Sequence, residues 1–423
     1  MKWRPLLVLV VATLSLLGWW AWPVAPVPRT SGPMSHEAFV WQRSWGDAER
    51  AAVEPGAGRF SRLLVLAGEV DLSRDRAVLG TPDDAALRQS GAAIGLVIRI
   101  EPWPGPFHET DAVVDVCRRA VQRARGAGIE PVELQLDFDC GQRKLDGYAV
   151  WLSAVRAALD ELPGGGVPVT ITALPAWLDR GAFRRLARQT DGYVLQVHSL
   201  QRPATIDEPA TLCDPVAARR WVEQAARLGT PFRVALPTYS YVLGFDPPES
   251  GGAFHGIAAE GELHTLDPAK RWTLLRADPA AMAALVQGWS ADRPMLMDGL
   301  VWFRLPVADD QLNWPWPTLD AVLDGREPKR SQVAESRRVE PGLIEIVLHN
   351  DGEADLPWPE RVRVDWPGAS PIARDGLAGY RWVEPGRLSR AAAPAWERFG
   401  PGQQITIAWL RFAHDTEVTA HVE

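Results

Sequence analysis

Hydrophobic and polar side chains alternate with a period of two along residues 131–140, which is the pattern of a half-buried β-strand. One face of this stretch carries Leu134, Leu136 and Phe138, and the other carries Glu133, Gln135, Asp137 and Asp139. Helical patterns flank it at residues 111–127 and 145–162, so we expect a parallel strand that is covered by helices. In a closed barrel the polar face of such a strand points into the interior.

The same succession of strand and helix patterns covers most of the chain. Strands are predicted at residues 39–45, 63–70, 94–101, 132–139, 167–174, 193–199, 232–239 and 300–306. Helices are predicted at residues 82–89, 111–127, 145–162, 180–188, 215–228 and 280–289. Eight strands with helices between them predict an α/β fold, a (β/α)8 or TIM barrel, over residues 36–330. A Rossmann sheet is disfavoured, because no G-x-G-x-x-G follows the first strand.

The character of the sequence changes after a linker at residues 324–330. Short alternating runs follow at residues 343–348, 361–366, 380–383, 387–388 and 404–412, with turn residues between them. Residues 331–423 are therefore predicted to form a small all-β, sandwich-like accessory domain. It could be a carbohydrate-binding module, or a packing domain that braces the barrel, and we favour the brace. In the first case the aromatic platforms would come from Trp358, Trp366, Trp382 or Trp396.

Residues 5–22 form an unbroken apolar run preceded by Lys2 and Arg4. Its length lies between that of a signal peptide and that of a membrane span, and the two basic residues favour a cytoplasmic N-terminal side. We therefore interpret residues 1–35 as a signal peptide or a membrane anchor with a linker; a buried helix is the alternative. The rest of the protein is expected in the periplasm or elsewhere outside the cytoplasm, with the cytoplasmic membrane as a partner.

Charge and cysteine content narrow the function classes. The 423 residues carry a formal net charge of −8, which argues against a nucleic-acid partner. Cys117 is expected to be a buried apolar residue, whereas Cys140 and Cys213 could form a disulfide in an oxidising compartment. No C-x-x-C pair occurs, so neither a metal site nor a cofactor is expected. The chain contains 20 Trp against 11 Phe, and exposed Trp rings are typical of carbohydrate-binding clefts.

A long segment at residues 242–298 separates the seventh and eighth predicted strands. Its Gly-rich turn includes Gly251 and Gly252, but no Gly-Lys-Ser/Thr follows, so a phosphate-binding loop is not expected. We predict a mobile rim or lid loop, since long loops in compact domains tend to be functional. His255 and His264 are expected to be exposed loop residues rather than metal ligands.

The inward polar face of the predicted strands supplies the candidate chemistry. Asp137 and Asp139 are like charges crowded at the end of one strand, which raises one pKa and suits a general acid. Glu101, at the end of the third strand, could supply the second carboxylate of a glycosidase pair. Arginines on the same face, such as Arg43 and Arg99, are expected to be structural partners of the carboxylates.

Several of these segments together resemble a bacterial family known as domain of unknown function 3142, over residues 39–323. The motifs are Val40-Trp41-Gln42-Arg43, Gln135-Leu136-Asp137-Phe138-Asp139-Cys140, Ile171-Thr172-Ala173-Leu174-Pro175-Ala176-Trp177-Leu178, Leu195-Gln196-Val197-His198, Ala235-Leu236-Pro237-Thr238-Tyr239 and Leu300-Val301-Trp302-Phe303-Arg304-Leu305-Pro306. The family has no settled activity and is grouped with glycoside-hydrolase barrels. The resemblance therefore implies a TIM barrel related to those enzymes.

The fourth strand also resembles, more distantly, the D-x-D-x-E run of the family 18 glycosidases. That likeness places Asp139 as general acid and Asp137 as its orienting partner, with Tyr239 and Trp302 as substrate-positioning residues. Cys140 follows Asp139, so one carboxylate of the series is missing, which puts the acetamido-assisted mechanism in doubt.

These observations predict a glycoside hydrolase that acts on a polysaccharide in the cell envelope or outside the cytoplasm. A barrel without catalytic activity that binds polysaccharide or an envelope partner is the alternative, and an esterase or deacetylase is a third possibility. The catalytic candidates are Asp139, Asp137 and Glu101. The expected partner is a poly- or oligosaccharide, positioned by His198, Gln196, Tyr239, Trp302, Arg304 and Trp41.

Overall fold

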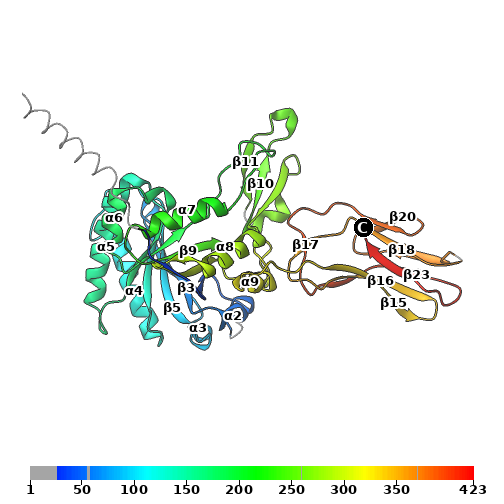
Figure 1. Cartoon of the computed structure of the whole chain (residues 1–423), viewed down its shortest axis with the longest axis horizontal. Coiled ribbons are helices and arrows are strands. Elements are labelled where there is room, and N and C mark those ends of the chain that lie inside the picture. Colours follow the sequence, from blue (N-terminus) through cyan, green and yellow to red (C-terminus); the bar gives the residue numbers. More distant parts are fainter. Residues whose placement is uncertain (1–25, 55–57, 259, 369) are drawn as a thin grey trace, which may run out of the picture.

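The computed structural model describes residues 26–54, 58–258, 260–368 and 370–423. The apolar run at residues 5–22, expected to be a signal or anchor, lies outside them. Figure 1 shows a helix-covered barrel and, beside it, a C-terminal domain built of strands. Within the described ranges, no helix combines the length and the apolar character that a bilayer crossing requires.

Eight parallel strands close into a barrel, because the first strand of the circuit pairs with both the second and the last. The predicted TIM barrel is thereby confirmed. A further short strand, β4 (Arg76–Leu79), pairs antiparallel with the carboxyl end of the second barrel strand. The barrel strands are β2 (Ser35–Val40), β3 (Arg62–Asp71), β5 (Ala93–Ile100), β6 (Glu133–Phe138), β7 (Val169–Ala173), β8 (Tyr193–Gln196), β9 (Phe232–Pro237) and β14 (Met297–Phe303).

Helices cover the outside of the barrel with amphipathic faces. In α4 (Ala112–Gly126), the buried residues Val113, Val116, Cys117 and Ala120 follow helical spacing. Two helices begin with an Asp N-cap followed by Pro, a sequence signal for a helix start. The other described helices are α2 (Asp47–Val53), α3 (Asp84–Gln89), α5 (Leu145–Asp160), α6 (Gly181–Ala187), α7 (Pro215–Ala226), α8 (Pro279–Ala291) and α9 (Trp316–Leu323).

The barrel interior consists of three tiers. A polar tier at the amino ends of the strands contains Glu37, Arg62, Glu133 and Arg233, which we call the base tier. An apolar middle tier is formed by Phe39, Leu64, Val97, Val194, Ala235 and Val301. A second polar tier at the carboxyl ends, which we call the mouth tier, contains Arg99, Glu101, Asp137 and Asp139. TIM-barrel active sites lie at this carboxyl end.

Charge is balanced in the base tier. The Arg233 guanidinium donates to both Glu133 carboxylate oxygens at 2.8 and 2.7 Å and also to Glu37. Arg62 donates to Glu133 at 2.9 Å. Burial alone would raise the pKa of Glu133, but the attraction of Arg233 and Arg62 outweighs it and lowers that pKa. Two carboxylates and two guanidiniums therefore neutralise one another, as a buried charge cluster requires.

The segment between β9 and β14 is structured, and its description as a rim loop was wrong. It contains a three-stranded antiparallel sheet of β10 (Ser240–Phe245), β11 (Phe254–Ala258) and β12 (Arg271–Arg276), which we call the insertion sheet. It projects from the barrel beside α8 (Figure 1). Gly251 and Gly252 sit in the β10–β11 connection with positive φ angles of 92° and 63°, which favours glycine. After α8, the short strand β13 (Arg293–Pro294) pairs with β1 (Arg29–Thr30).

The C-terminal domain contains two four-stranded antiparallel sheets around one core, which confirms the predicted all-β fold. Trp358, Trp366 and Trp382 pack against this core, whereas Trp396 packs on the insertion sheet. One sheet contains β15 (Gln332–Glu340), β16 (Leu343–Asn350), β23 (Gln404–Arg411) and β19 (Ala373–Gly376). The other contains β20 (Tyr380–Glu384), β21 (Arg387–Arg390), β18 (Arg361–Asp365) and β24 (Thr419–Val422), and a separate pair is formed by β17 (Leu356–Pro357) and β22 (Arg398–Phe399).

The C-terminal domain is fastened to the barrel unit by ion pairs. The buried Asp355 carboxylate accepts from Arg276 of the insertion sheet at 2.7 and 2.6 Å and from Arg398 of its own domain at 3.4 Å. Arg326, which follows α9, donates to Glu353 in the segment between β16 and β17. These contacts join the two domains through residues on both sides of the junction.

The disulfide considered between Cys140 and Cys213 is not formed. All three cysteines are free and buried. Burial raises the pKa of the Cys140 and Cys213 thiols to about 12, so both remain protonated.

Candidate active site

Two carboxylates stand at the carboxyl end of β6. Asp137 faces the barrel interior and is 8% exposed, and Asp139 follows it on the same face and reaches solvent at the mouth. Burial, with the neighbouring Asp137 charge added to it, raises the pKa of Asp139 to about 6. Burial also raises the pKa of Asp137, against the attraction of Arg99. The pair therefore retains a proton at pH values where isolated aspartates are ionised.

Arg99 holds a third carboxylate, that of Glu101, beside this pair. It lies directly opposite Asp137 in the register of β5 and β6. Its guanidinium is 3.4 Å from the Asp137 carboxylate and 3.3 Å from that of Glu101. The Glu101 side chain is 40% exposed, so it faces the open end of the barrel. The arrangement contains three carboxylates and one guanidinium, an excess of negative charge that the base tier does not have.

A chain of hydrogen bonds orients Asp137 from the opposite side. The Thr172 hydroxyl, on β7, is hydrogen-bonded to the Asp137 carboxylate. The same hydroxyl accepts from the Gln135 amide at 2.8 Å. Because Gln135 and Thr172 are both buried, this chain fixes the Asp137 carboxylate before any ligand enters.

His198 and Tyr239 meet at the mouth, as expected for residues at the ends of β8 and β9. The His198 Nδ1 lies 3.2 Å from the Tyr239 hydroxyl, and both rings pack on Phe303. Burial lowers the pKa of His198 to about 3, so its imidazole is neutral at ordinary pH. Tyr239 remains partly exposed and can present its hydroxyl to a ligand.

Gln196 and Trp41 also lie on the interior side of the barrel. The Gln196 amide donates to the His198 backbone carbonyl at 3.2 Å, so it supports the turn after β8. Trp41 packs edge-on against Phe303, with ring centroids 5.2 Å apart, and the Arg99 guanidinium lies 5.9 Å from its ring centroid. Trp41 therefore belongs to the wall next to the carboxylates.

Trp302 does not reach the mouth, and the role predicted for it is wrong. Its side chain is fully buried, and its indole N–H donates to His36 Nδ1 at 3.1 Å on the helix-facing side of β14. The inward positions of this strand are Val301 and Phe303 instead. Both faces of β14 are apolar, so alternation alone could not assign them. Phe303, which the sequence reasoning missed, is the aromatic residue that β14 contributes to the mouth.

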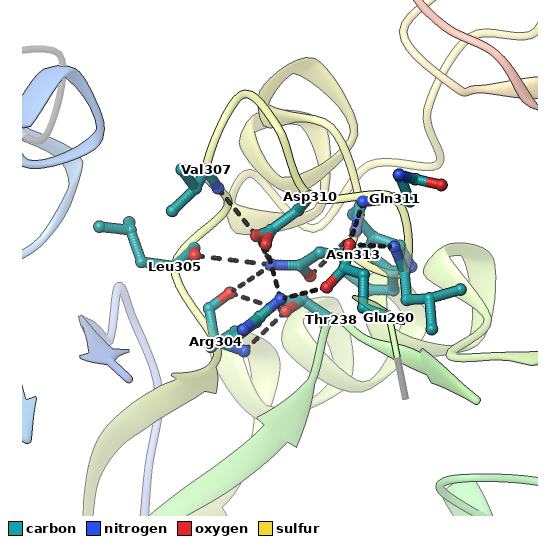
Figure 2. A network of polar contacts seen from close by, with 10 residues as sticks. Thr238, Glu260, Arg304, Leu305, Val307, Asp310, Gln311 and Asn313 are labelled. Carbon is teal, nitrogen blue, oxygen red and sulfur yellow. Dashed lines mark hydrogen bonds and ion pairs between the residues drawn. The ribbon is translucent and has the colours of Figure 1, made fainter. Parts of the chain in front are cut away.

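Arg304 takes part in a structural network, which Figure 2 shows. Its guanidinium lies between Asp310 at 2.6 Å and Glu260 at 3.1 Å. Its backbone exchanges hydrogen bonds with the Thr238 hydroxyl at 2.7 and 2.8 Å, and Asn313 donates to its carbonyl. Arg304 thus ties the β14–α9 loop to β9 and to the insertion, and its charge is already neutralised. It is not placed to bind sugar as predicted.

A hollow of about 780 Å³ opens beside Asp139. We call it the mouth hollow. It is lined by the loops after β5, β6 and β7, including Pro102, Trp103, Pro104, Asp139, Arg143 and Lys144. Trp103, Arg143 and Lys144 were not among the sequence candidates, because loop residues have no periodicity to reveal where they face. Their positions directly after the ends of β5 and β6 were the available signal.

A second hollow of about 840 Å³ lies between the barrel and the C-terminal domain, away from the acid pair. Partly buried Trp316, Trp358 and Trp396 line it together with carboxylates such as Glu54 and Asp309. Within the described ranges, no three His, Cys, Asp or Glu side chains are grouped so that they could hold a metal ion.

Comparison with protein families identifies the barrel. Residues 93–308, which are half of the chain, match the model of a domain of unknown function (DUF3142). The chain belongs to this family. In this DUF3142 protein, a second domain of unknown function (DUF8456) matches residues 333–413, within the C-terminal strands. No curated protein matches the sequence.

Among solved structures, the DUF3142 protein is similar to the spore cortex-lytic enzyme SleL of Bacillus megaterium, at 12% identity and a TM-score of 0.48, with 71% of this chain and 76% of that chain covered. It is also similar to a chitinase of Chromobacterium violaceum, at 14% identity and a TM-score of 0.45, covering 69% and 98%. Chitinase ChiA74 of Bacillus thuringiensis matches at 11% identity and a TM-score of 0.41, covering 92% and 100%.

Proposed function

We propose that this protein is a glycoside hydrolase with Asp139 as its general acid. The observation that carries the proposal is the Asp137–Asp139 pair, whose retained proton faces a hollow at the carboxyl end of a TIM barrel. A general acid is most effective when its pKa lies near the working pH, and the pKa of Asp139 at about 6 meets that condition. Half-buried Trp103 at the hollow offers an aromatic face for a sugar ring.

The residues divide the reaction among them. Asp139 gives its proton to the glycosidic oxygen as the bond from that oxygen to the anomeric carbon breaks. Glu101, held by Arg99, takes a proton from water as the water oxygen bonds to the same carbon. Asp137, oriented by Thr172, keeps negative charge beside Asp139 and so favours its protonated form. Tyr239 and Trp41 line the wall against which the sugar packs.

Screening the full chain, purified in detergent, against a panel of bacterial polysaccharides with reducing-end detection tests this proposal. Asp139→Asn should lower turnover by about 10²–10⁴-fold, as expected for loss of a general acid, while the protein stays folded. Asp207→Asn, at an exposed carboxylate, is the control and should keep full turnover. Saturable binding without cleavage by the parent protein would instead identify a binding protein that lacks catalytic activity.

We further propose that the protein works outside the cytoplasm, anchored by or exported through residues 5–22. The support is the sequence itself, an apolar run preceded by Lys2 and Arg4. Alkaline phosphatase folds to an active enzyme only after export, so a fusion after Glu423 should be active in cells. An inactive fusion, beside an active cytoplasmic reporter at the same position, contradicts this location.

A further inference from the structure

The mouth hollow departs from the acidic character of the whole protein. The chain carries a formal net charge of −8, but the charged residues lining this hollow are Asp139, Arg143 and Lys144. The hollow between the two domains shows the opposite bias, with Glu54, Asp309 and further carboxylates in its wall. The mouth hollow thus brings two cations to the side of the acid pair.

Neither cation of the mouth hollow is neutralised by a carboxylate within the described part of the chain. The Lys144 ammonium donates to the Pro104 backbone carbonyl, a neutral acceptor on the same wall. Arg143 is exposed, with its guanidinium free of ion pairs among the described residues. By contrast, the mouth-tier Arg99 is paired with two carboxylates. Arg143 and Lys144 therefore keep their capacity to bind an anion.

Trp103 completes this wall. Its indole N–H donates to the Pro106 backbone carbonyl at 2.8 Å, which fixes the ring in the loop after β5. A fixed aromatic ring next to two unpaired cations fits a ligand with a flat apolar face and a negative substituent. A pyranose ring that bears a carboxylate has both features.

We propose that the mouth hollow binds a uronic acid or a similarly carboxylated sugar, so that the substrate is an acidic polysaccharide. This inference rests on the proposed function, because it places the acidic sugar next to the bond that Asp139 protonates. Arg143 and Lys144 act as specificity residues that contact the carboxylate, and Trp103 packs on the ring. A negative substituent close to Asp139 also favours the protonated acid.

The test measures binding by the full chain carrying Asp139→Asn, so that no substrate is consumed. The probes are alginate, polygalacturonate and hyaluronan, each compared with its carboxyl-reduced form, which keeps the linkage and removes the charge. At least one acidic polymer should bind about tenfold more tightly than its reduced form, the value of one good charge-assisted contact. Arg143→Gln with Lys144→Gln should lower that preference to less than about twofold.

A charge-matched control separates this effect from the overall field of the protein. Arg188 and Arg227 are exposed residues at the carboxyl ends of α6 and α7, far from the mouth in the chain's topology. Replacing both by Gln changes the net charge equally and should leave the preference intact. An equal effect of the two double variants would assign the preference to net charge and overturn the site.

The outcomes keep this inference distinct from the proposed function. Failure of every acidic polymer to bind, or equal binding of each polymer and its reduced form, overturns the inference. If the parent protein then cleaves a neutral polymer with Asp139-dependent turnover, the proposed function stands alone. If an acidic polymer binds through Arg143 and Lys144 but is not cleaved, the anion site stands and the hydrolase proposal fails.

Discussion

The two polar tiers of the barrel contain the same chemical groups, carboxylates and guanidiniums, but in different proportions. In the base tier, Glu37 and Glu133 face Arg62 and Arg233, and each buried carboxylate has a guanidinium partner. In the mouth tier, the Arg99 guanidinium faces three carboxylates, those of Glu101, Asp137 and Asp139. In the base tier, Arg233 and Arg62 lower the pKa of Glu133, although burial still raises that of Glu37. In the mouth tier, burial and the Asp137 charge raise the pKa of Asp139 to about 6.

The comparison shows how charge count separates structural from functional carboxylates inside one barrel. In a balanced, buried cluster each carboxylate faces a guanidinium, and removing one partner leaves a buried charge uncompensated. A cluster short of one or two cations cannot ionise fully, so it keeps a proton that a substrate can receive. The first three predictions below change one tier and leave the other as the reference, and the fourth changes a hydroxyl that belongs to neither tier.

Breaking the base tier should have the largest effect. Arg233→Met leaves Glu37 and Glu133 buried without their main partner, so the free energy of unfolding should fall by about 3–5 kcal/mol. Arg43→Met is the matched control, because Arg43 pairs with Glu69 while 62% of its side chain is exposed, and should lower it by less than about 1 kcal/mol. Chemical denaturation measures both. Equal losses in the two variants would contradict the distinction between the tiers.

Removing one charge from the mouth tier should shift the pH dependence of catalysis. Turnover should fall above pH about 6, where Asp139 loses its proton. Asp137→Asn removes the charge that helps to raise the pKa of Asp139, so the alkaline limb should move down by about one pH unit, or roughly tenfold in rate at neutral pH. The pH profile of kcat/KM measures the shift, and Asp207→Asn should leave it in place. If the alkaline limb does not move in Asp137→Asn, Asp139 is not the acid whose titration the profile reports.

The mouth tier should also reduce stability at neutral pH. The pKa of Asp139 is about 6 in the folded state, above its ordinary value of 3.8, so the folded protein binds the proton more tightly than the unfolded chain does. This group therefore destabilises the fold progressively as the pH rises from about 4 to 6. Asp139→Asn should increase the free energy of unfolding at pH 8 by about 1 kcal/mol, a value reduced by solvent screening. The gain should vanish near pH 3; a gain that persists there has another origin.

Removing the Tyr239 hydroxyl, which is hydrogen-bonded to His198, should have the smallest effect on stability. Tyr239→Phe removes the partner of the buried His198 Nδ1 and should lower the free energy of unfolding by about 0.5–1 kcal/mol. If Tyr239 also contacts sugar, KM should rise while the pH profile of kcat/KM stays unchanged. Tyr193→Phe is the control, because it removes a buried hydroxyl that donates to the Ala225 carbonyl, away from His198 and Tyr239. A changed pH profile in Tyr239→Phe would place this hydroxyl in the proton transfer itself.

Much of the fold could be predicted from the sequence because strand alternation and helix periodicity were strong. β6 was read correctly on both faces, since its polar and apolar residues separate cleanly, and the polar face contains both the base and mouth carboxylates. The insertion sheet was missed, because its turn-rich strands resemble loop sequence. The structure shows that Gly251 and Gly252 form a strand connection there.

The candidate site was predictable in part, and the failures share one cause. Residues on a strand with distinct faces, such as Asp137, were placed correctly. Trp302 was misplaced, because its strand is apolar on both sides and a shift of one residue exchanges the faces. The pairing of Arg304 with Asp310 and Glu260 depends on loops that only the folded chain brings together.

The middle tier makes one side of the barrel different from the others. Val97, Val194 and Val301 are completely buried, but Gln135 lies beside Val97 in the register of β5 and β6 and donates to Thr172. Along β6 and β7, polar side chains therefore follow one another from Glu133 and Thr170 at the base to Thr172 and Asp137 at the mouth. The rest of the layer is apolar, so this pair of strands is the side of the barrel on which the charge of the base can polarise the groups around the acid pair.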